Sequence, residues 1–337
     1  MVKYGIDTEL FVGDNVIRPV HDFYNGIKVH RFPLKTIRVL DLMYRFVSPS
    51  FLLSLNKYKP DVIHCLCYRH FTTDLSILYS KIKHVPIMIS VHGLGHNPTR
   101  LFQKFLTLYD YTIGQIMLRL VKKIIAYPFK DALEKPITRF IDKVTFISPA
   151  IDYQKFKSKT DIEEIKEQYG LQDKFVLLNV GRETIDDVKG QRFLTKAFTK
   201  MNIPNSKLLI AGTNQVKQER NIIKLGFIPQ NVLGSLYETA NVFVQTSKFE
   251  TASRVLMEAL CFGLPIISTK VGIAPYIINN ENGFLVDHDD YQGFKIAVQK
   301  IRSGTIKRSS GTKYIELFDW NKIVTEFIQV YNDLLEE

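Results

Sequence analysis

The chain has 337 residues, of which 45% are hydrophobic, 23% charged and 12% aromatic. These proportions are typical of soluble globular proteins and exclude a fibrous, low-complexity or intrinsically disordered chain. Because a single hydrophobic core seldom grows beyond about 250–300 residues, the length predicts two domains.

The net charge of +11 comes almost entirely from the first half of the chain. Residues 1–150 contain 21 Lys and Arg against 11 Asp and Glu, whereas residues 151–337 contain 24 against 23. This asymmetry predicts an anionic partner for the first half, such as a membrane surface, a lipid-linked phosphate or nucleic acid. A solvated basic surface without a specific partner is the equal alternative.

Cysteine usage and hydropathy together predict a cytoplasmic protein. Only three cysteines occur, and Cys65 and Cys67 lie two apart in an apolar run, where a strand would put both on one face instead of forming a metal-ligand turn. The sequence contains no run of about 18 uncharged apolar residues and no apolar signal segment in its first 30 residues. We therefore expect a cytoplasmic location, with the inner face of the membrane as the site of any peripheral contact.

The chain opens on an unusual pattern for an α/β domain. Residues Met1–Gly5 have the pattern of the last turn of a helix, with Gly5 as its left-handed cap, and lead directly into a strand. A Rossmann-like domain opens instead with a buried strand and a glycine-rich turn. The sequence thus predicts that the first βα unit of the N-terminal domain is missing.

Short β-branched runs then alternate with helical patterns, as in a parallel α/β sheet. The predicted strands of the first half are Asp7–Val12, Ile27–Phe32, Asp61–Leu66, Pro86–Val91 and Val144–Ser148. Those of the second half are Phe175–Val180, Lys207–Ala211, Ile223–Phe227, Asn241–Gln245, Pro265–Ser268 and Gly283–Val286. Because the pattern restarts after Phe156, we predict domains over residues 1–152 and 153–319.

Two helices are prominent in the sequence. One is expected from about Thr99 to Ile125, with an apolar stripe followed by Lys122 and Lys123; core packing is the ordinary explanation of such a stripe, and membrane contact is the alternative. The other, Trp320–Leu335, has Asp319 as its N-cap, and the segment 320–337 is expected to pack back on the first domain.

The stretch Ser247–Gly272 carries the strongest chemical signal. After the strand Asn241–Gln245, Thr251 or Ser253 can cap a helix that begins near Arg254. The N-terminus of that helix points out of the carboxyl edge of the sheet, where open α/β folds bind ligands and where free N–H groups favour a phosphate. Glu250 lies just before the helix and Glu258 inside it, so two carboxylates are available to accept hydrogen bonds from sugar hydroxyls.

A second segment of the same domain supplies cations. The sequence NVGRETIDDVKG at Asn179–Gly190 places a glycine turn, Arg182 and Lys189 after a strand. Arg can bind phosphate oxygens through two parallel hydrogen bonds and Lys adds a compact charge, so the pair suits a diphosphate.

These two segments, in this order and spacing, resemble the retaining glycosyltransferases of family four, which have the GT-B fold. The Glu-x7-Glu pattern fits Glu250 and Glu258, and the resemblance continues through LGFIP at Leu225–Pro229, ENGFLV at Glu281–Val286 and the Trp320 helix. In the first half, NGIKVHRFP, KPDVIHCL and VPIMISVHGLGH have looser counterparts. The resemblance implies two Rossmann-like, doubly wound domains that face each other across a cleft.

The resemblance also implies roles for individual residues. Arg182 and Lys189 would hold the donor diphosphate, Glu258 the ribose, and Glu250 the donor sugar or a nearby phosphate, while the backbone at Phe227 and Ile228 would flank the base. The expected catalytic residues are Glu250, His92, Arg182 and Lys189. The expected donor-binding residues are Gly181, Arg182, Lys189, Phe227, Ile228, Glu250, Ser253, Arg254 and Glu258.

The function implied is transfer of a hexose from a nucleotide-diphosphate sugar to an acceptor hydroxyl with retention of configuration, in the synthesis of a glycan, glycolipid or cell-surface polysaccharide. No metal or other cofactor is expected, because Arg182, Lys189 and a helix N-terminus can stabilise the leaving group. The acceptor would be a lipid-linked compound, a glycan or a small molecule. A non-catalytic GT-B-like binding subunit and a nucleotide-sugar epimerase are the alternatives, and nucleic-acid binding lacks a recognisable module.

Overall fold

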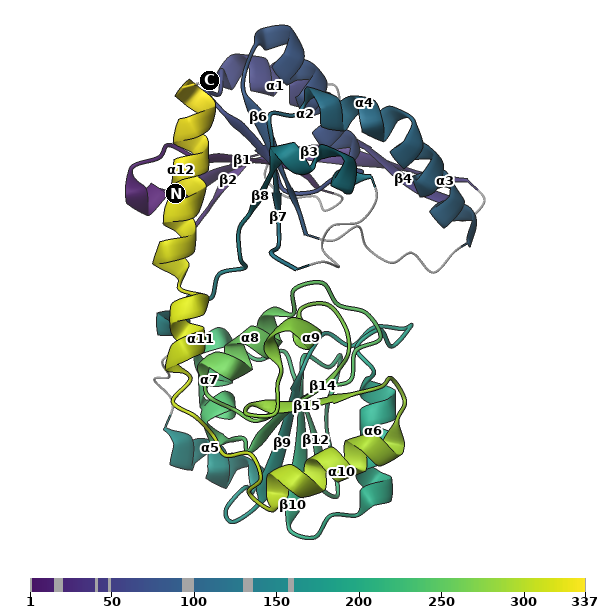
Figure 1. Ribbon diagram of the computed structural model, residues 1–337, viewed down its shortest axis with the longest axis vertical. Coiled ribbons are helices and arrows are strands. Elements are labelled where there is room, and N and C mark those ends of the chain that lie inside the picture. The colour runs from purple at the N-terminus through teal and green to yellow at the C-terminus, as the bar shows by residue number, and fades with distance from the viewer. Residues whose placement is uncertain are drawn as a thin grey trace. The chain divides into compact units, whose positions relative to one another are not determined.

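The computed structural model describes residues 2–14, 21–39, 42–47, 50–92, 100–129, 136–156 and 161–336. The chain divides into two compact units. Unit 1 contains Met1–Ser148 and Val324–Glu337, and unit 2 contains Pro149–Ile323. Each is an α/β unit in which parallel strands alternate with helices (Figure 1).

Unit 1 contains two four-stranded sheets. In the first, β1 and β2 flank β3, which extends into a hairpin with β4; in the second, β5, β6, β7 and β8 follow one another in parallel. The strands are β1 (Glu9–Asp14), β2 (His21–Tyr24), β3 (Ile27–Val39), β4 (Leu42–Val47), β5 (Ile63–Cys65), β6 (Ile87–Val91), β7 (Lys123–Ala126) and β8 (Val144–Phe146). The helices are η1 (Val2–Tyr4), α1 (Ser50–Tyr58), α2 (Phe71–Lys83), α3 (Arg100–Tyr111), α4 (Ile113–Leu120) and η3 (Ile137–Lys143).

One core unites these elements. Ile87, Ile89 and Val91 of β6 are buried and pack with α2 and α4 side chains such as Ile77 and Leu118. The burial of every β6 residue explains the continuous apolar run of its sequence, since a parallel strand covered on both faces has no polar side.

The prediction of one long helix over Thr99–Ile125 is wrong in its second half. The structure has two helices, α3 and α4, separated by Thr112 in a non-helical conformation, and Lys123–Ala126 forms β7. Ile124 and Ile125 are buried in the sheet, where the β-branched side chains fit well, so tertiary packing overrides a helical periodicity that runs on through the sequence. Thr99 itself lies outside the described residues.

Unit 2 is built around a seven-stranded sheet with the order β11, β12, β10, β9, β13, β14, β15. All neighbours are parallel except β11, which forms an antiparallel edge hairpin with β12. The strands are β9 (Phe175–Val180), β10 (Ser206–Ala211), β11 (Val216–Glu219), β12 (Ile222–Gly226), β13 (Val242–Gln245), β14 (Ile266–Thr269) and β15 (Gly283–Val286). The helices are η4 (Tyr153–Phe156), α5 (Ile162–Tyr169), α6 (Gln191–Met201), α7 (Gln230–Thr239), α8 (Arg254–Cys261), α9 (Ala274–Ile277), α10 (Tyr291–Arg302) and α11 (Thr312–Leu317). The last helix, α12 (Trp320–Glu336), has only its first turn in unit 2.

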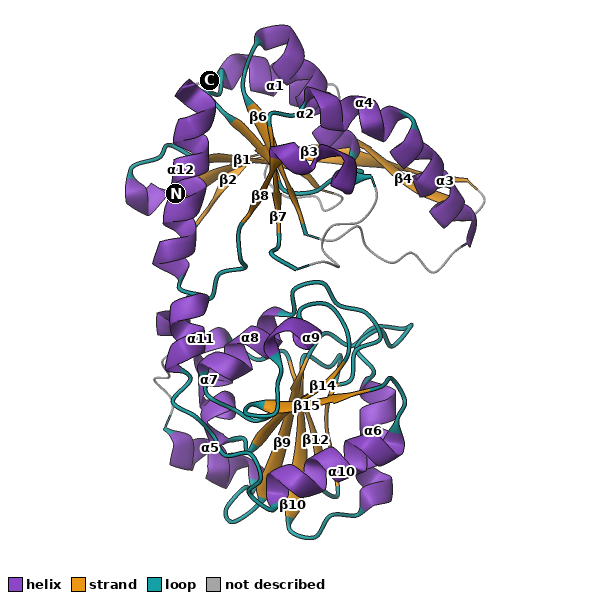
Figure 2. Cartoon of the chain, in the orientation of Figure 1, coloured by secondary structure: helices purple, strands orange, loops and turns teal. Residues whose placement is uncertain are grey.

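Helices cover both faces of this sheet. Figure 2 shows α6 and α10 on one side of the strands and α5, α7 and α8 on the other. Leu177 and Leu208 belong to the core that includes Leu194 of α6 and Phe294 of α10. The sheet is therefore doubly wound, and its strands read as apolar runs for the same reason as β6.

The C-terminal helix α12 begins where the sequence predicts. The Lys322 N–H donates to Asp319 Oδ1 over 2.8 Å, which makes Asp319 the N-cap. From Val324 onward the helix groups with unit 1.

Candidate active site

The order of the strands in unit 2 locates the site. The chain moves from β9 to β10 and β12 on one side, then returns to the other side of β9 with β13, β14 and β15. The winding therefore reverses between β9 and β13. Open α/β sheets bind ligands at such a switch point, beyond the carboxyl ends of the strands.

Backbone contacts and hydrogen bonds join the loop after β9 to the loop after β13. Gly190, at the end of the loop after β9, has φ of +66°, and a Cβ there would lie 1.9 Å from the Thr246 carbonyl oxygen in the loop after β13. The Thr246 hydroxyl donates to the Gly190 carbonyl over 2.9 Å, and the Lys248 N–H donates to the Val188 carbonyl over 2.7 Å. Only glycine allows this approach.

Lys189 and Glu250 meet across the switch point. Lys189 Nζ donates to Glu250 Oε1 over 2.6 Å, and the Ser247 hydroxyl donates to the same oxygen over 2.8 Å. The Glu250 side chain is 11% exposed and that of Lys189 31%, so both reach the surface of the site. The structure thus brings together a cation from one strand end and a carboxylate from the next.

Gly181 gives Lys189 its position. The Lys189 stem lies against this residue, since a Cβ on Gly181 would be 3.4 Å from Lys189 Cγ. Gln191, the first residue of α6, holds the turn by donating from Nε2 to the Gly181 carbonyl over 2.8 Å. Arg182 follows Gly181 and is exposed, outside the Lys189–Glu250 pair.

The loop after β13 leads into α8, whose first residue is Arg254. Ser253 occupies the N-cap position, and its hydroxyl donates to Gln245 Oε1, but in the described part of the chain its oxygen accepts no hydrogen bond from a helix N–H. The structure confirms Ser253 at the N-cap position of a helix that begins at Arg254, although among the described residues no side-chain hydrogen bond caps α8. The N-terminus of a helix favours an anion, because its N–H groups and the positive end of its dipole point outward.

Glu258 lies one turn further along α8 than Arg254 and is almost fully buried. The buried Tyr237 hydroxyl donates to Glu258 Oε2 over 2.9 Å. Burial raises the pKa of Glu258, while the hydrogen bond from Tyr237 and the charge of Arg254 oppose that rise. The structure therefore sets Glu258 deeper than Glu250, with a fixed orientation.

Phe227 and Ile228 follow β12 at the same edge of the sheet. Phe227 is 87% exposed, which is unusual for a large aromatic side chain and leaves its ring face available for stacking. The end of β12 is held by a hydrogen bond from the Gly226 N–H to the Thr213 hydroxyl, over 2.9 Å.

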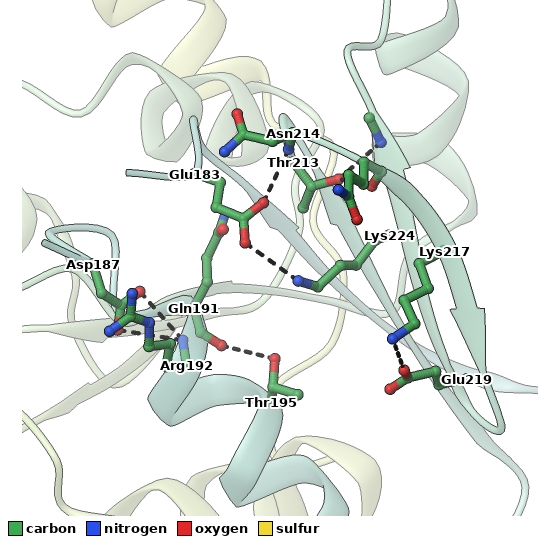
Figure 3. Close-up of polar contacts among 12 residues, drawn as sticks. Glu183, Asp187, Gln191, Arg192, Thr195, Thr213, Asn214, Lys217, Glu219 and Lys224 are labelled. Carbon is green, nitrogen blue, oxygen red and sulfur yellow. Dashed lines mark hydrogen bonds and ion pairs between the residues drawn. The ribbon is translucent and has the colours of Figure 1, made fainter. Parts of the chain in front are cut away.

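A polar network secures this side of the site (Figure 3). Glu183 accepts from the Asn214 N–H over 2.9 Å and from Lys224 Nζ over 3.3 Å, which joins the loop after β9 to the ends of β10 and β12. The backbone hydrogen bond to Asn214 and the charge of Lys224 lower the pKa of Glu183. Asp187 accepts from the Arg192 N–H at the start of α6, which closes the same loop at its other end.

His92 lies in unit 1, directly after β6. Part of the His92 side chain is exposed to solvent, and the burial of the remainder lowers its pKa. The centroid of its ring lies 5.3 Å from that of the Tyr127 ring. Residues 93–96, which complete the first-half motif VPIMISVHGLGH, lie outside the described residues.

A buried hydrogen-bond network joins β5, β6 and α12. His64 of β5 binds the Tyr331 hydroxyl of α12 through Nδ1 over 2.7 Å and the Ser90 hydroxyl through Nε2 over 2.6 Å. Burial, together with the charge of His92, lowers the pKa of His64 to about 4. The imidazole is therefore neutral at physiological pH, with both nitrogens engaged.

Comparison with known proteins gives the class of enzyme. Residues 161–316 match the family model described as glycosyl transferases group 1. A relative, an uncharacterized glycosyltransferase of Methanocaldococcus jannaschii, is 26% identical over 94% of this chain and 87% of its own length. The chain is a glycosyltransferase. The match covers most of unit 2, including the switch point with Lys189 and Glu250.

Solved structures show that the glycosyltransferase has the GT-B fold. The sucrose-phosphate synthase of Thermosynechococcus elongatus superposes with a TM-score of 0.75 at 20% identity, over 99% of this chain and 90% of that one. Anabaena HepE in complex with UDP and glucose gives a TM-score of 0.70 at 18% identity, over 91% and 86% of the two chains.

Several residues that support the site were missed in the sequence. Gln191, Glu183 and Tyr237 hold the side chains or loops named above, but each acts through a contact with a distant segment. Of these three residues, Gln191 is the one that the sequence could have indicated, because a polar residue that follows a turn glycine is well placed to donate to a carbonyl of the same loop. The sequence of the glycosyltransferase contains no local pattern that indicates the His64 network, since Tyr331 lies 267 residues further along the chain than His64.

Proposed function

We propose that this glycosyltransferase transfers a hexose from a nucleotide-diphosphate sugar to an acceptor hydroxyl, with retention of configuration, as a family four enzyme. The observation that carries the proposal is the Lys189–Glu250 contact at the switch point of unit 2, beside an α8 N-terminus without a side-chain cap. A diphosphate is the ligand whose charge suits these groups. The relative in complex with UDP and glucose supports the same class of donor.

The chemistry follows from the charges that develop during transfer. The bond between the anomeric carbon and the phosphate oxygen breaks, and its electron pair stays on the diphosphate. Lys189, the exposed Arg182 and the α8 N–H groups would stabilise that charge, which is the preorganised positive environment that lowers a barrier. We propose that they do so without a metal ion.

Glu250 is the carboxylate that would bind the donor sugar. The contacts with Lys189 and Ser247 both fall on Oε1, so Oε2 is available to accept from a donor sugar hydroxyl. Glu258, deeper and held by Tyr237, would accept from the ribose, and Phe227 would provide an apolar face beside the base. His92 keeps its proposed role near the transferred sugar.

Retention requires the acceptor oxygen to bond to the anomeric carbon on the face that the phosphate leaves. The acceptor proton would pass to an oxygen of the departing diphosphate, so no carboxylate needs to act as a covalent nucleophile. The acceptor class that we propose is a lipid-linked or glycan hydroxyl in the synthesis of a glycolipid or cell-surface polysaccharide, since the basic first half suits an anionic lipid or lipid phosphate.

The test is a panel of UDP, GDP, ADP and dTDP sugars, each incubated with the full chain and a membrane extract. We expect one donor to release its nucleoside diphosphate and to label the extract, with the product anomer equal to that of the donor by NMR. Binding of a donor without release would identify a binding subunit, and interconversion of donors without an acceptor would identify an epimerase. Either outcome, or an inverted product, contradicts the proposal.

A further inference from the structure

The helices α3 and α4 form an exposed layer on unit 1. On their inner side, Arg69 forms a buried ion pair with Asp110, and the Gln115 amide donates to the Asp110 carbonyl over 2.9 Å. The Tyr109 hydroxyl donates to Asp74 of α2 over 2.6 Å. These contacts fix the orientation of both helices and therefore fix which side chains point outward.

Large apolar side chains are exposed on the outer side of the pair, beside polar residues such as Gln103 and Thr107. Leu108 is 61% exposed and Tyr111 53%, and these two residues lie three apart on α3. Ile113 is 51% exposed and Ile116 54%, with the same spacing on α4. Residues three apart share a helix face, so each helix presents a pair of large apolar side chains to solvent. We call these four residues the α3–α4 apolar patch.

Lys and Arg outnumber carboxylates around this patch, although the exposed Asp142 lies next to Lys143. Residues 100–126 contain five Lys and Arg and a single carboxylate, Asp110. Asp110 is 5% exposed and paired with Arg69, so it contributes little negative charge to the surface. Lys143 adds a cation at the end of α4, where Nζ donates to the Arg119 carbonyl over 2.7 Å and to the Val121 carbonyl over 2.8 Å.

From this combination we infer that the α3–α4 apolar patch docks unit 1 onto a bilayer that contains anionic lipids. The four apolar side chains would enter the boundary between headgroups and acyl chains, while Lys104, Arg119 and Lys122 meet lipid phosphates. A helix with large apolar side chains on a surface where Lys and Arg outnumber carboxylates has the composition of an interfacial membrane helix.

Other partners fit this surface less well. Protein interfaces are depleted of Lys. Nucleic acids bind mainly through their phosphates, which do not bury exposed Leu and Ile side chains. The inference deepens the proposed function, because it names the place where a lipid-linked acceptor would be reached. Docking needs no donor, however, so it is measured independently of transfer.

The test is co-flotation of the full chain with lipid vesicles. We expect binding to vesicles of phosphatidylcholine with 30% phosphatidylglycerol and at least tenfold weaker binding to pure phosphatidylcholine, since each Lys or Arg near an anionic surface contributes about a fivefold gain. Salt at 0.5 M should reduce the binding. Equal binding to neutral and anionic vesicles, or no binding to either, overturns the inference.

Two sets of variants locate the surface. The double variant Leu108→Gln/Ile116→Gln should bind anionic vesicles at least tenfold more weakly, because burying such a side chain contributes about tenfold or more. The control is Ile296→Gln on α10 of unit 2, where the wild-type side chain is 50% exposed. Lys104→Gln/Arg119→Gln should reduce binding and its salt dependence, against Lys81→Gln/Lys83→Gln on α2 as the matched pair.

Each variant is first checked for an unchanged melting temperature. Wild-type binding by a folded Leu108→Gln/Ile116→Gln protein would overturn the assignment. So would a self-association of the wild type that this variant abolishes, since the patch would then be a protein interface. Failure of vesicle binding leaves nucleoside diphosphate binding at Lys189 intact, so the two proposals fail separately.

Discussion

Lys189 and Glu250 stand at the carboxyl ends of neighbouring strand units, and 2.6 Å separates Nζ from Oε1. The pair spans the point at which the sheet of unit 2 reverses its winding. Its position makes it the first place to probe the proposed chemistry.

Lys189→Ala should lower kcat/KM for the donor identified in the panel by about 10- to 100-fold, because a charge-assisted contact with a phosphate contributes about 1.5–3 kcal/mol. Lys196→Ala removes an exposed lysine of α6 and should leave the rate unchanged. Steady-state kinetics on folded proteins checks both. Equal losses in the two variants would show a general charge effect and not a specific contact.

Gly190→Ala should disrupt the site through the backbone. The added Cβ would lie 1.9 Å from the Thr246 carbonyl oxygen at φ of +66°, so the two loops must separate and donor binding must weaken. Gly304→Ala is the control, because its φ is +83° and no atom lies within 4 Å of the added Cβ. We expect it to cost about 1 kcal/mol of stability and no donor affinity. Unchanged donor binding by Gly190→Ala would be incompatible with the described loops.

Glu258 should make stability fall with rising pH. Burial raises the pKa of Glu258 above its ordinary value of 4.5, so the folded state holds the proton more tightly than the unfolded state. The stabilisation from the protonated form is present below pH 4.5 and is lost as the pH rises through the folded-state pKa. Glu258→Gln keeps an acceptor for Tyr237 and removes the titration. Urea unfolding of unit 2 should therefore favour the variant increasingly between pH 4.5 and pH 7, and a constant difference would disprove the assignment.

His64 should have the opposite dependence. Its pKa of about 4 in the folded state lies below the ordinary 6.5, so its contribution is complete above pH 6.5 and is lost as the pH falls toward 4. The loss should reach about 3 kcal/mol, from a shift of that size at about 1.36 kcal/mol per unit. Hydrogen exchange of residues 324–336, corrected for intrinsic rates, should show α12 losing protection as the pH falls in the wild type, and less so in His64→Gln. Identical pH profiles for the two proteins would exclude His64 as the cause.

The sequence predicts the buried parts of this molecule best. Strands β9 and β15 lie at their predicted bounds, because a parallel strand covered on both faces is a short apolar run between turns. β7 was missed because Lys123–Ala126 prolongs the apolar periodicity of the preceding helix, and only the neighbouring strands decide its conformation. The β3–β4 hairpin and the β11 edge strand were also absent from the prediction.

The candidate site likewise has features that local sequence patterns predict and features that depend on contacts between distant segments. Turn glycines and charged residues near strand ends could be picked out along the chain, but their contacts join distant segments: 61 residues separate Lys189 from Glu250. The sequence suggested Ser253 as a helix cap, and Ser253 has that position, but its hydroxyl donates to Gln245 Oε1 and accepts from no N–H of the described helix. Local patterns indicate which residues are available, and the fold decides which of them meet.

The most direct test is calorimetric titration of the full chain with UDP, GDP, ADP and dTDP. The account predicts that one nucleoside diphosphate binds the wild type, that Lys189→Ala weakens its dissociation constant at least tenfold, and that Lys196→Ala leaves it unchanged. Binding of equal strength by the wild type and Lys189→Ala would contradict a diphosphate site at the Lys189–Glu250 pair.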